Sequence, residues 1–210
     1  MSLVLIIIST TLYLIGIIPY LYHVFHGRVV PHPFTWTIWS IFAITNGYIL
    51  SHEQWITETL IPIGVRSLAL CIWACLWWYF IRKIRIWVLD FVALFFAITI
   101  IVLMKIIGNN ETVWLMILID LLVLTPTLKK LWINPDSEDP LAWFMAAVSQ
   151  LILIYTIQNF TFTSLGYILY LVLVNFSVAF IIYRRRIYTS SWKYFLRKIL
   201  PSFALKKKLW

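Results

Sequence analysis

Two charged residues lie inside apolar segments of the chain, where an ionised side chain is unusual. Asp120 and Arg66 each lie about eight residues inside a predicted helix, so at about 1.5 Å per residue their depths in a membrane match. An isolated charge at that depth is costly, whereas paired charges that face a cavity are tolerated. The positions therefore predict an ion pair between Arg66 and Asp120. Three interpretations stay open: a static structural bridge, an outer gate, or a proton-titrating site for coupled transport.

Tryptophans and amides share faces of two other predicted helices. The two stripes are Trp36, Trp39, Ala43 and Asn46, and Trp143, Ala147 and Gln150. An amide in hydrocarbon is costly without hydrogen-bond partners, so Asn46 and Gln150 are expected to face protein or a water-filled cavity. Aromatic faces and amides together suit a sugar, a nucleoside or a similar small polar solute. The tryptophans equally fit an interfacial belt, and the amides equally fit interhelical hydrogen bonds.

The elements that carry these residues are predicted to be membrane-spanning helices. Apolar residues make up 62% of the chain, charged residues make up 12%, and the mean hydropathy is +0.91. Apolar runs of about 20 residues are long enough to cross a bilayer. They occur at 3–24, 33–51, 59–81, 87–105, 112–131, 140–158 and 163–183. The sequence thus predicts an all-α integral membrane protein with seven transmembrane helices.

The distribution of charge predicts the orientation of these helices. Basic residues gather in the loops after the first, third, fifth and seventh segments and in the C-terminal tail. The opposite loops carry mainly acidic and amide residues, such as Glu53, Glu58 and Glu111. Because cytoplasmic loops are enriched in Lys and Arg, we expect the N-terminus outside and the C-terminus in the cytoplasm. Short loops and few cysteines suit a bacterial inner membrane.

The tail at 187–210 is basic and aromatic. Trp192, Phe195 and Leu196 share one helical face, while Lys193 and Arg197 lie elsewhere on the helix. This composition is typical of an amphipathic helix on an anionic inner leaflet. The formal net charge of +9 therefore indicates topology and contact with anionic lipids, and the chain carries no nucleic-acid-binding motif.

A pattern of prolines occurs twice, 107 residues apart. Pro19 and Pro33 are fourteen residues apart, as are Pro126 and Pro140. Pro33 and Pro140 are expected to begin helices, with Asp139 as the cap of the second. The helices that contain Pro19 and Pro126 run in the same direction, so the two copies are parallel. The expected plan is a three-helix bundle at 1–83, a linker helix at 84–107, a second three-helix bundle at 108–186, and the tail at 187–210.

This plan and two segments of the chain resemble the SWEET and PQ-loop transporters. The segments are IPYLYHVFHGRVVPHPFTW at 18–36 and TPTLKKLWINPDSEDPLAW at 125–143. The resemblance implies that Pro19 and Pro126 are hinges for a cytoplasmic gate, the alternative being ordinary helix kinks. It also implies that Asn175 contacts the substrate. The family's glutamine after each hinge proline is replaced here by Tyr20 and Thr127. The plan is also similar, more distantly, to that of PnuC-type vitamin carriers.

Together these features predict a small-solute transporter that works by alternating access between the two bundles. Tyr13 corresponds to Asp120 in the repeat and is expected to line the same cavity. A membrane receptor or assembly subunit built on the same fold is the alternative. No nucleophile–base pair, metal-ligand spacing or phosphate-binding loop stands out, so we expect neither an enzyme nor a cofactor. Because one chain carries both repeats, a monomer is sufficient, and a homo-oligomer stays open.

Overall fold

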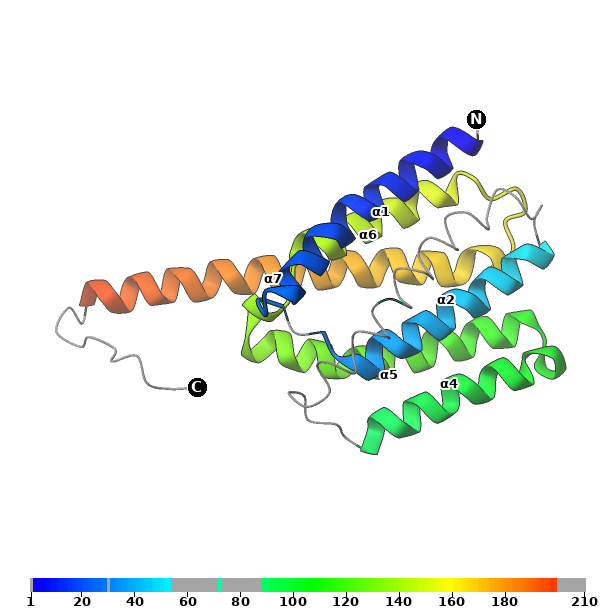
Figure 1. Ribbon diagram of the computed structural model, residues 1–210, viewed down its shortest axis with the longest axis horizontal. Coiled ribbons are helices and arrows are strands. Elements are labelled where there is room, and N and C mark those ends of the chain that lie inside the picture. The colour runs from blue at the N-terminus through cyan, green and yellow to red at the C-terminus, as the bar shows by residue number, and fades with distance from the viewer. Residues whose placement is uncertain (1, 30, 54–71, 73–87, 200–210) are drawn as a thin grey trace.

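Six of the predicted apolar segments form α-helices. The computed structural model of the protein describes residues 2–29, 31–53, 72 and 88–199. The helices are α1 (Ser2–Phe25), α2 (Pro33–Glu53), α4 (Val88–Ile107), α5 (Asn109–Ile133), α6 (Pro140–Ile154) and α7 (Phe162–Ile199), with a 3-10 turn η2 at Pro135–Ser137 (Figure 1). No strand occurs among the described residues, which confirms the all-α prediction for them. The predicted segment 59–81, which contains Arg66, lies outside the described residues.

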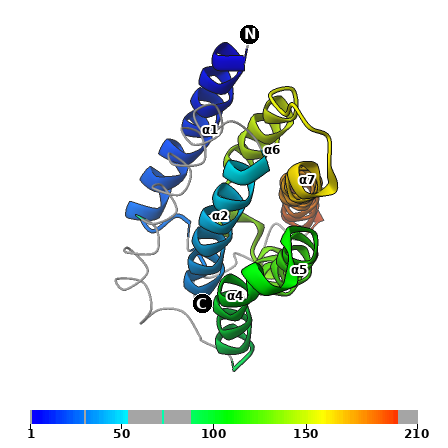
Figure 2. The same ribbon diagram turned by 90° about the vertical axis from the view of Figure 1, so that its right-hand side faces the viewer.

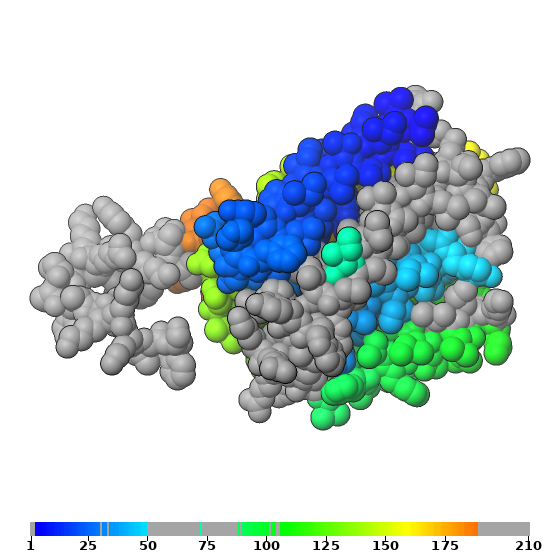
Figure 3. Space-filling model, in the orientation of Figure 1, coloured from blue at the N-terminus to red at the C-terminus, as the bar shows by residue number. Residues whose placement is uncertain are grey.

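Three described helical segments are long and apolar enough to cross a membrane: Leu3–Phe25, Asn109–Ile133 and Phe162–Tyr188. Figure 3 shows α1 as a ridge across one face of the molecule. Its exposed large side chains are Leu3, Val4, Ile7, Ile8, Ile15, Ile18, Tyr22 and Phe25. Keeping such apolar surface in water costs about 25 cal/mol per Å², a cost that lipid removes. The surface is therefore compatible with an integral membrane protein.

Helix α6 is shorter than the predicted segment 140–158. It ends at Ile154 after 15 residues, or about 22 Å of rise, which is less than the roughly 30 Å of a hydrocarbon core. The Thr156 hydroxyl donates to the Leu153 carbonyl at 2.7 Å and closes the last turn. The polar residues that follow cannot extend an apolar helix, so the prediction placed the end of this helix too late.

Helix α7 is longer than the predicted segment 163–183. It continues through the basic residues at 184–186 to Ile199, and its C-terminal part extends beyond the other helices (Figure 1). The predicted tail at 187–210 thus begins inside α7, and its residues 200–210 lie outside the described part of the chain. Lys and Arg have good helix propensity, so the basic run ends the apolar stretch without ending the helix.

The helices that pack together are far apart in the sequence. Helix α1 lies along α6, α6 lies along α7, and α4 packs on α5. Helix α2 contacts α4, α5 and α7, and Figure 2 shows it in the middle of the assembly. Pro33 and Pro140 begin α2 and α6, and the Asp139 carboxylate accepts a hydrogen bond from the Leu141 backbone N–H at 2.9 Å. The predicted starts of these two helices are confirmed.

Small residues allow α1 and α6 to approach closely. A Cβ atom built on Gly16 would lie 2.8 Å from the Cβ of Met145 and 3.3 Å from the Cα of Ala142. The Ser9 hydroxyl, which is fully buried, donates to the Ser149 carbonyl of α6 at 2.7 Å. Small residues at contacts between apolar helices permit close backbone packing and hydrogen bonds between helices.

We expect Gly16→Leu to separate α1 from α6 and to lower the free energy of unfolding. Overpacking of this kind costs about 1–3 kcal/mol, and the Cβ of Met145 has little freedom to move away. Thr11→Leu adds a similar apolar side chain to an exposed position of the same helix and serves as the control. Thermal unfolding in detergent measures both, and equal melting temperatures would contradict the close approach at Gly16.

His32 is buried in the loop between α1 and α2. Its Nε2 lies 3.7 Å from the Asp90 carboxylate, and its Nδ1 lies 3.2 Å from the Thr35 hydroxyl oxygen. Burial lowers the pKa of the His32 imidazole below its usual 6.5. Asp90 acts against this shift, and Lys130 adds to it. The fold therefore favours the neutral imidazole.

This shift predicts that the protein loses stability as the pH falls below about 6.5. The unfolded chain takes up a proton on His32 at a higher pH than the folded chain, so acid favours unfolding. His32→Gln removes this proton uptake and should show a smaller drop in melting temperature between pH 8 and pH 5.5 than the wild type. A drop of the same size in both proteins would exclude His32 as the cause.

Candidate functional site

A cavity of about 150 Å³ lies between α1, α2, α5, α6 and α7. An engineered protein cavity of about this volume binds benzene, so a small organic molecule fits. Helices α1, α2 and α5 contribute Tyr13, Ile17, Tyr20, Trp36, Trp39, Ala43, Asn46 and Asp120. Helix α6, the turn after it and α7 contribute Ala142, Trp143, Ala146, Gln150, Leu153, Thr156, Ile157, Tyr167, Ile168, Leu171, Val174 and Asn175.

Most of the predicted site residues meet at this cavity. Its walls include Tyr13, Trp36, Trp39, Asn46, Asp120, Trp143, Gln150 and Asn175. Pro19 and Pro126 lie inside α1 and α5 and are not among the described residues that line it. Arg66 lies outside the described residues, so the Arg66–Asp120 ion pair stays a prediction. That these side chains bind a substrate also stays a prediction.

The cavity walls repeat at the spacing of the proline pattern. Five pairs of lining residues are separated by 107 positions: Tyr13 and Asp120, Trp36 and Trp143, Trp39 and Ala146, Ala43 and Gln150, and Asn46 and Leu153. The α6 stripe therefore uses Ala146, whereas the sequence analysis placed Ala147 on it. Ala147 is fully buried and is not among the described lining residues.

The Asp120 carboxylate joins three helices. It is 1% exposed, and it lies on α5. One of its oxygens accepts a hydrogen bond from the indole N–H of Trp39 on α2, and the other accepts from the Tyr170 hydroxyl on α7 at 2.6 Å. Both carboxylate oxygens thus have a donor, which offsets part of the cost of burying the charge.

Sequence reasoning missed the α7 tyrosines. Counting back from Asn175 in steps of four residues, the lining residues Leu171 and Tyr167 lie on the same helical face. That spacing would have identified Tyr167. Tyr170 lies beside this face, stacked on Tyr167 with ring centroids 5.9 Å apart. Its bond to Asp120 depends on how α5 and α7 pack, which no local pattern shows.

A chain of aromatic rings crosses from α1 through α2 to α6. The ring centroids are 5.5 Å apart for Tyr20 and Trp36, 5.3 Å for Trp36 and Trp39, and 5.4 Å for Trp39 and Trp143. Trp36 and Trp143 are 8% and 6% exposed, so they lie inside the bundle and not on its outer surface. The two contacts between tryptophans are edge-to-face, and such contacts add about 0.5–1.5 kcal/mol each beyond their buried area.

The amide side chains lie at other points of the cavity wall. The Asn175 amide nitrogen donates to the Leu171 carbonyl of its own helix at 2.7 Å. Asn46 is 9% exposed, and Gln150 is half-buried on the facing helix. Buried amides are stabilised by hydrogen-bond partners, and a bound polar solute is one source of them.

Beyond the aromatic rings lies a buried acidic residue that the sequence analysis did not single out. Glu138 is 1% exposed, and its carboxylate accepts hydrogen bonds from the Tyr20 hydroxyl at 2.9 Å, the Trp143 indole at 3.4 Å and the Lys130 ammonium at 2.5 Å. Arg186 of α7 donates to its backbone carbonyl at 2.6 Å. We call these five residues the Glu138 cluster. The sequence signal for this cluster is the acidic run PDSEDP, which lies in one of the loops that are otherwise basic.

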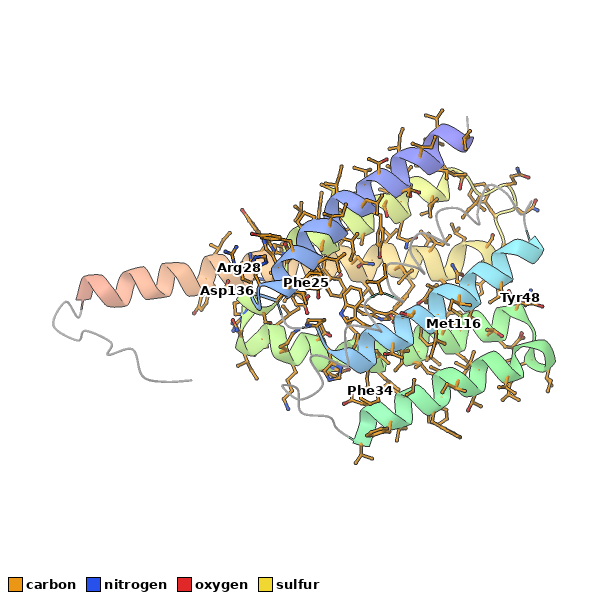
Figure 4. All side chains as sticks on the ribbon, in the orientation of Figure 1. Phe25, Arg28, Phe34, Tyr48, Met116 and Asp136 are labelled. Atoms are coloured by element: carbon orange, nitrogen blue, oxygen red, sulfur yellow. The ribbon has the colours of Figure 1, made fainter. Side chains whose placement is uncertain are left out.

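The Glu138 cluster lies at the basic end of the bundle. Figure 4 shows Arg28, Phe25 and Asp136 at this end and Tyr48 at the other. Next to the cluster, the His23 ring nitrogen Nδ1 lies 2.9 Å from the Asp139 carboxylate. Two contacts, His23 with Asp139 and Tyr20 with Glu138, thus join the C-terminal end of α1 to the start of α6.

Comparison with protein-family models, with curated proteins and with solved structures found no match for this chain. The function is therefore inferred from the cavity and the residues around it.

Removing the charge of Glu138 should destabilise the fold. Glu138→Gln keeps the shape of the side chain but takes the carboxylate partner from Lys130, and we expect a loss of about 1–3 kcal/mol. Asp136→Asn is the matched control, because its ion pair with Arg186 is exposed, with Asp136 at 70%, and should change stability by less than about 0.5 kcal/mol. Thermal unfolding in detergent distinguishes them, and a similar melting temperature for both variants would show that the Glu138 charge contributes little.

Proposed function

We propose that the protein is a membrane transporter for a small polar solute, which it moves by alternating access between two three-helix bundles. The observation that carries this proposal is the cavity itself. A space large enough for a small organic molecule lies between five helices, and its walls carry aromatic rings, three amides and one carboxylate. Pockets with an apolar and aromatic lining and a few polar groups are typical of small-molecule sites.

The arrangement of the helices supports two related bundles. Helix α1 packs on α6, and α2 contacts α5. A two-fold axis that exchanges α1 with α5 and α2 with α6 would produce this pair of contacts. The five pairs of lining residues at a spacing of 107 fit the same axis. In the proposed seven-helix plan, the segment 59–81 completes the first bundle, α4 is the linker, and α5, α6 and α7 form the second bundle.

The distribution of charge supports the proposed orientation in the membrane. Arg28 follows α1, Lys129 lies in the C-terminal part of α5, and α7 carries basic residues at 184–186. Arg28 lies at the same end of the bundle as Asp136 (Figure 4). We place this end in the cytoplasm and the N-terminus outside. In that orientation the Glu138 carboxylate lies between the cavity and the cytoplasm, where an inner gate is required, and its partners Tyr20 and Trp143 form part of the cavity wall.

Alternating access predicts that one cavity position is reached from both sides of the membrane. We would replace Cys71 and Cys75 by serine and introduce Ala146→Cys, which faces the cavity. A membrane-impermeant thiol reagent should label this cysteine both in right-side-out and in inverted membrane vesicles. Ala97→Cys is the control, since Ala97 is fully buried in the contact of α4 with its neighbours and should remain unlabelled.

Labelling of Ala146→Cys from one side only would contradict alternating access. It would favour the second class of function, a receptor or assembly subunit whose cavity opens in one direction. Labelling of the Ala97→Cys control to the same extent would mean that the reagent enters unfolded protein, and the comparison would then be repeated on protein selected by gel filtration.

A further inference from the structure

The described wall of the cavity carries a negative charge, which a neutral solute would not need. Among the described lining residues, Asp120 is the one with a formal charge. Its carboxylate is 1% exposed, so little water reaches it from outside the bundle. In such surroundings the field of a charge is screened far less than in water. A ligand that brings a positive charge would therefore gain more here than a neutral one.

The hydrogen bonds of Asp120 orient its charge without neutralising it. The Trp39 indole and the Tyr170 hydroxyl each donate one hydrogen bond, and neither group carries a positive charge. A carboxylate has about four lone-pair positions, so these two bonds leave acceptor capacity. The anion is held in place by three helices and can attract a ligand.

Aromatic side chains surround the same space. Six of them line the cavity: Tyr13, Tyr20, Trp36, Trp39, Trp143 and Tyr167. The face of an aromatic ring attracts a cation, most strongly for tryptophan, and cages of such rings recognise quaternary ammonium groups. The rings exclude water and supply contact area for methyl groups. A sugar, by contrast, needs many available hydrogen-bonding groups, and several polar groups of the wall are already bonded within the protein: the Tyr20 hydroxyl, the Trp39 indole and the Asn175 amide nitrogen.

We propose that the solute is a small organic cation with a quaternary or methylated ammonium group, bound with its charge near Asp120 and its methyl groups against the tryptophans. This inference rests on the proposed function and names its substrate class. Choline has the chemistry to test it, because its size suits a cavity of about 150 Å³. Its neutral isostere, 3,3-dimethylbutan-1-ol, has the same shape without the charge.

The experiment measures the melting temperature of the detergent-purified full chain against rising concentrations of choline chloride, of 3,3-dimethylbutan-1-ol and of glucose, at constant ionic strength set with sodium chloride. A ligand that binds the folded state raises the melting temperature as its concentration exceeds Kd. We expect stabilisation by choline at concentrations at least tenfold lower than by its isostere, and none by glucose.

Two variants test the two parts of the site. Asp120→Asn removes the charge and should weaken choline binding at least tenfold while leaving the isostere unchanged. Trp143→Leu removes an aromatic face and keeps the charge, and should weaken choline binding about 3- to 30-fold. Asp136→Asn removes an exposed carboxylate outside the cavity and should leave binding unchanged.

Equal stabilisation by choline and its isostere, or stabilisation by glucose alone, would overturn the organic-cation inference. So would choline binding that appears only in Arg66→Gln, because it would mean that Arg66 neutralises Asp120 in the native protein. If no ligand binds while Ala146→Cys is still labelled from both sides, this inference fails and the transporter proposal stands. If Ala146→Cys is labelled from one side only and choline still binds, the transporter proposal fails and the organic-cation site stands.

Discussion

A carboxylate buried between apolar helices must be hydrogen-bonded, and this constraint acts at the centre of the molecule. Asp120 meets it through Trp39 and Tyr170, so one side chain links α2, α5 and α7. Trp39 in turn contacts Trp36 and Trp143, which extends the junction to α6. Asp120 and Trp39 form part of the wall of the cavity, and residues of α1 and α6 form another part of it.

The packing of α1 on α6 is the second requirement. Two helices can border a cavity of fixed shape only if their backbones approach closely somewhere along their length. Gly16 and the buried pair Ser9 and Ser149 provide that approach on the side of α1 that faces α6. At the basic end, Tyr20 reaches across to Glu138 and holds the same two helices. A movement of α1 away from α6 would thus have to break specific polar contacts at that end.

Cavity residues that lie 107 positions apart in the chain differ in their chemistry. The five pairs of lining residues occupy matching positions, yet within a pair the side chains mostly differ: Asp120 corresponds to Tyr13, Gln150 to Ala43, and Asn46 to Leu153. Only the tryptophans Trp36 and Trp143 are the same. Such a cavity suits a solute with two chemically different ends, because each end meets a wall of its own kind.

Within the described residues, the sequence by itself determined which segments are helices, though not where α6 and α7 end, and which residues share a helical face. A run of apolar residues fixes a helix in a membrane protein, and the period of 3.6 residues places Trp36, Trp39 and Asn46 together whatever the helix packs against. The cost of burying Asp120 likewise indicated that a partner or cavity lies nearby. Only the tertiary structure decided that Ala146 lines the cavity in place of Ala147, that Tyr170 and Trp39 are the partners of Asp120, and that Glu138 joins α1 to α6. The reason is physical: these contacts depend on the rotation and crossing of helices that are far apart along the chain, and local periodicity carries no information about either.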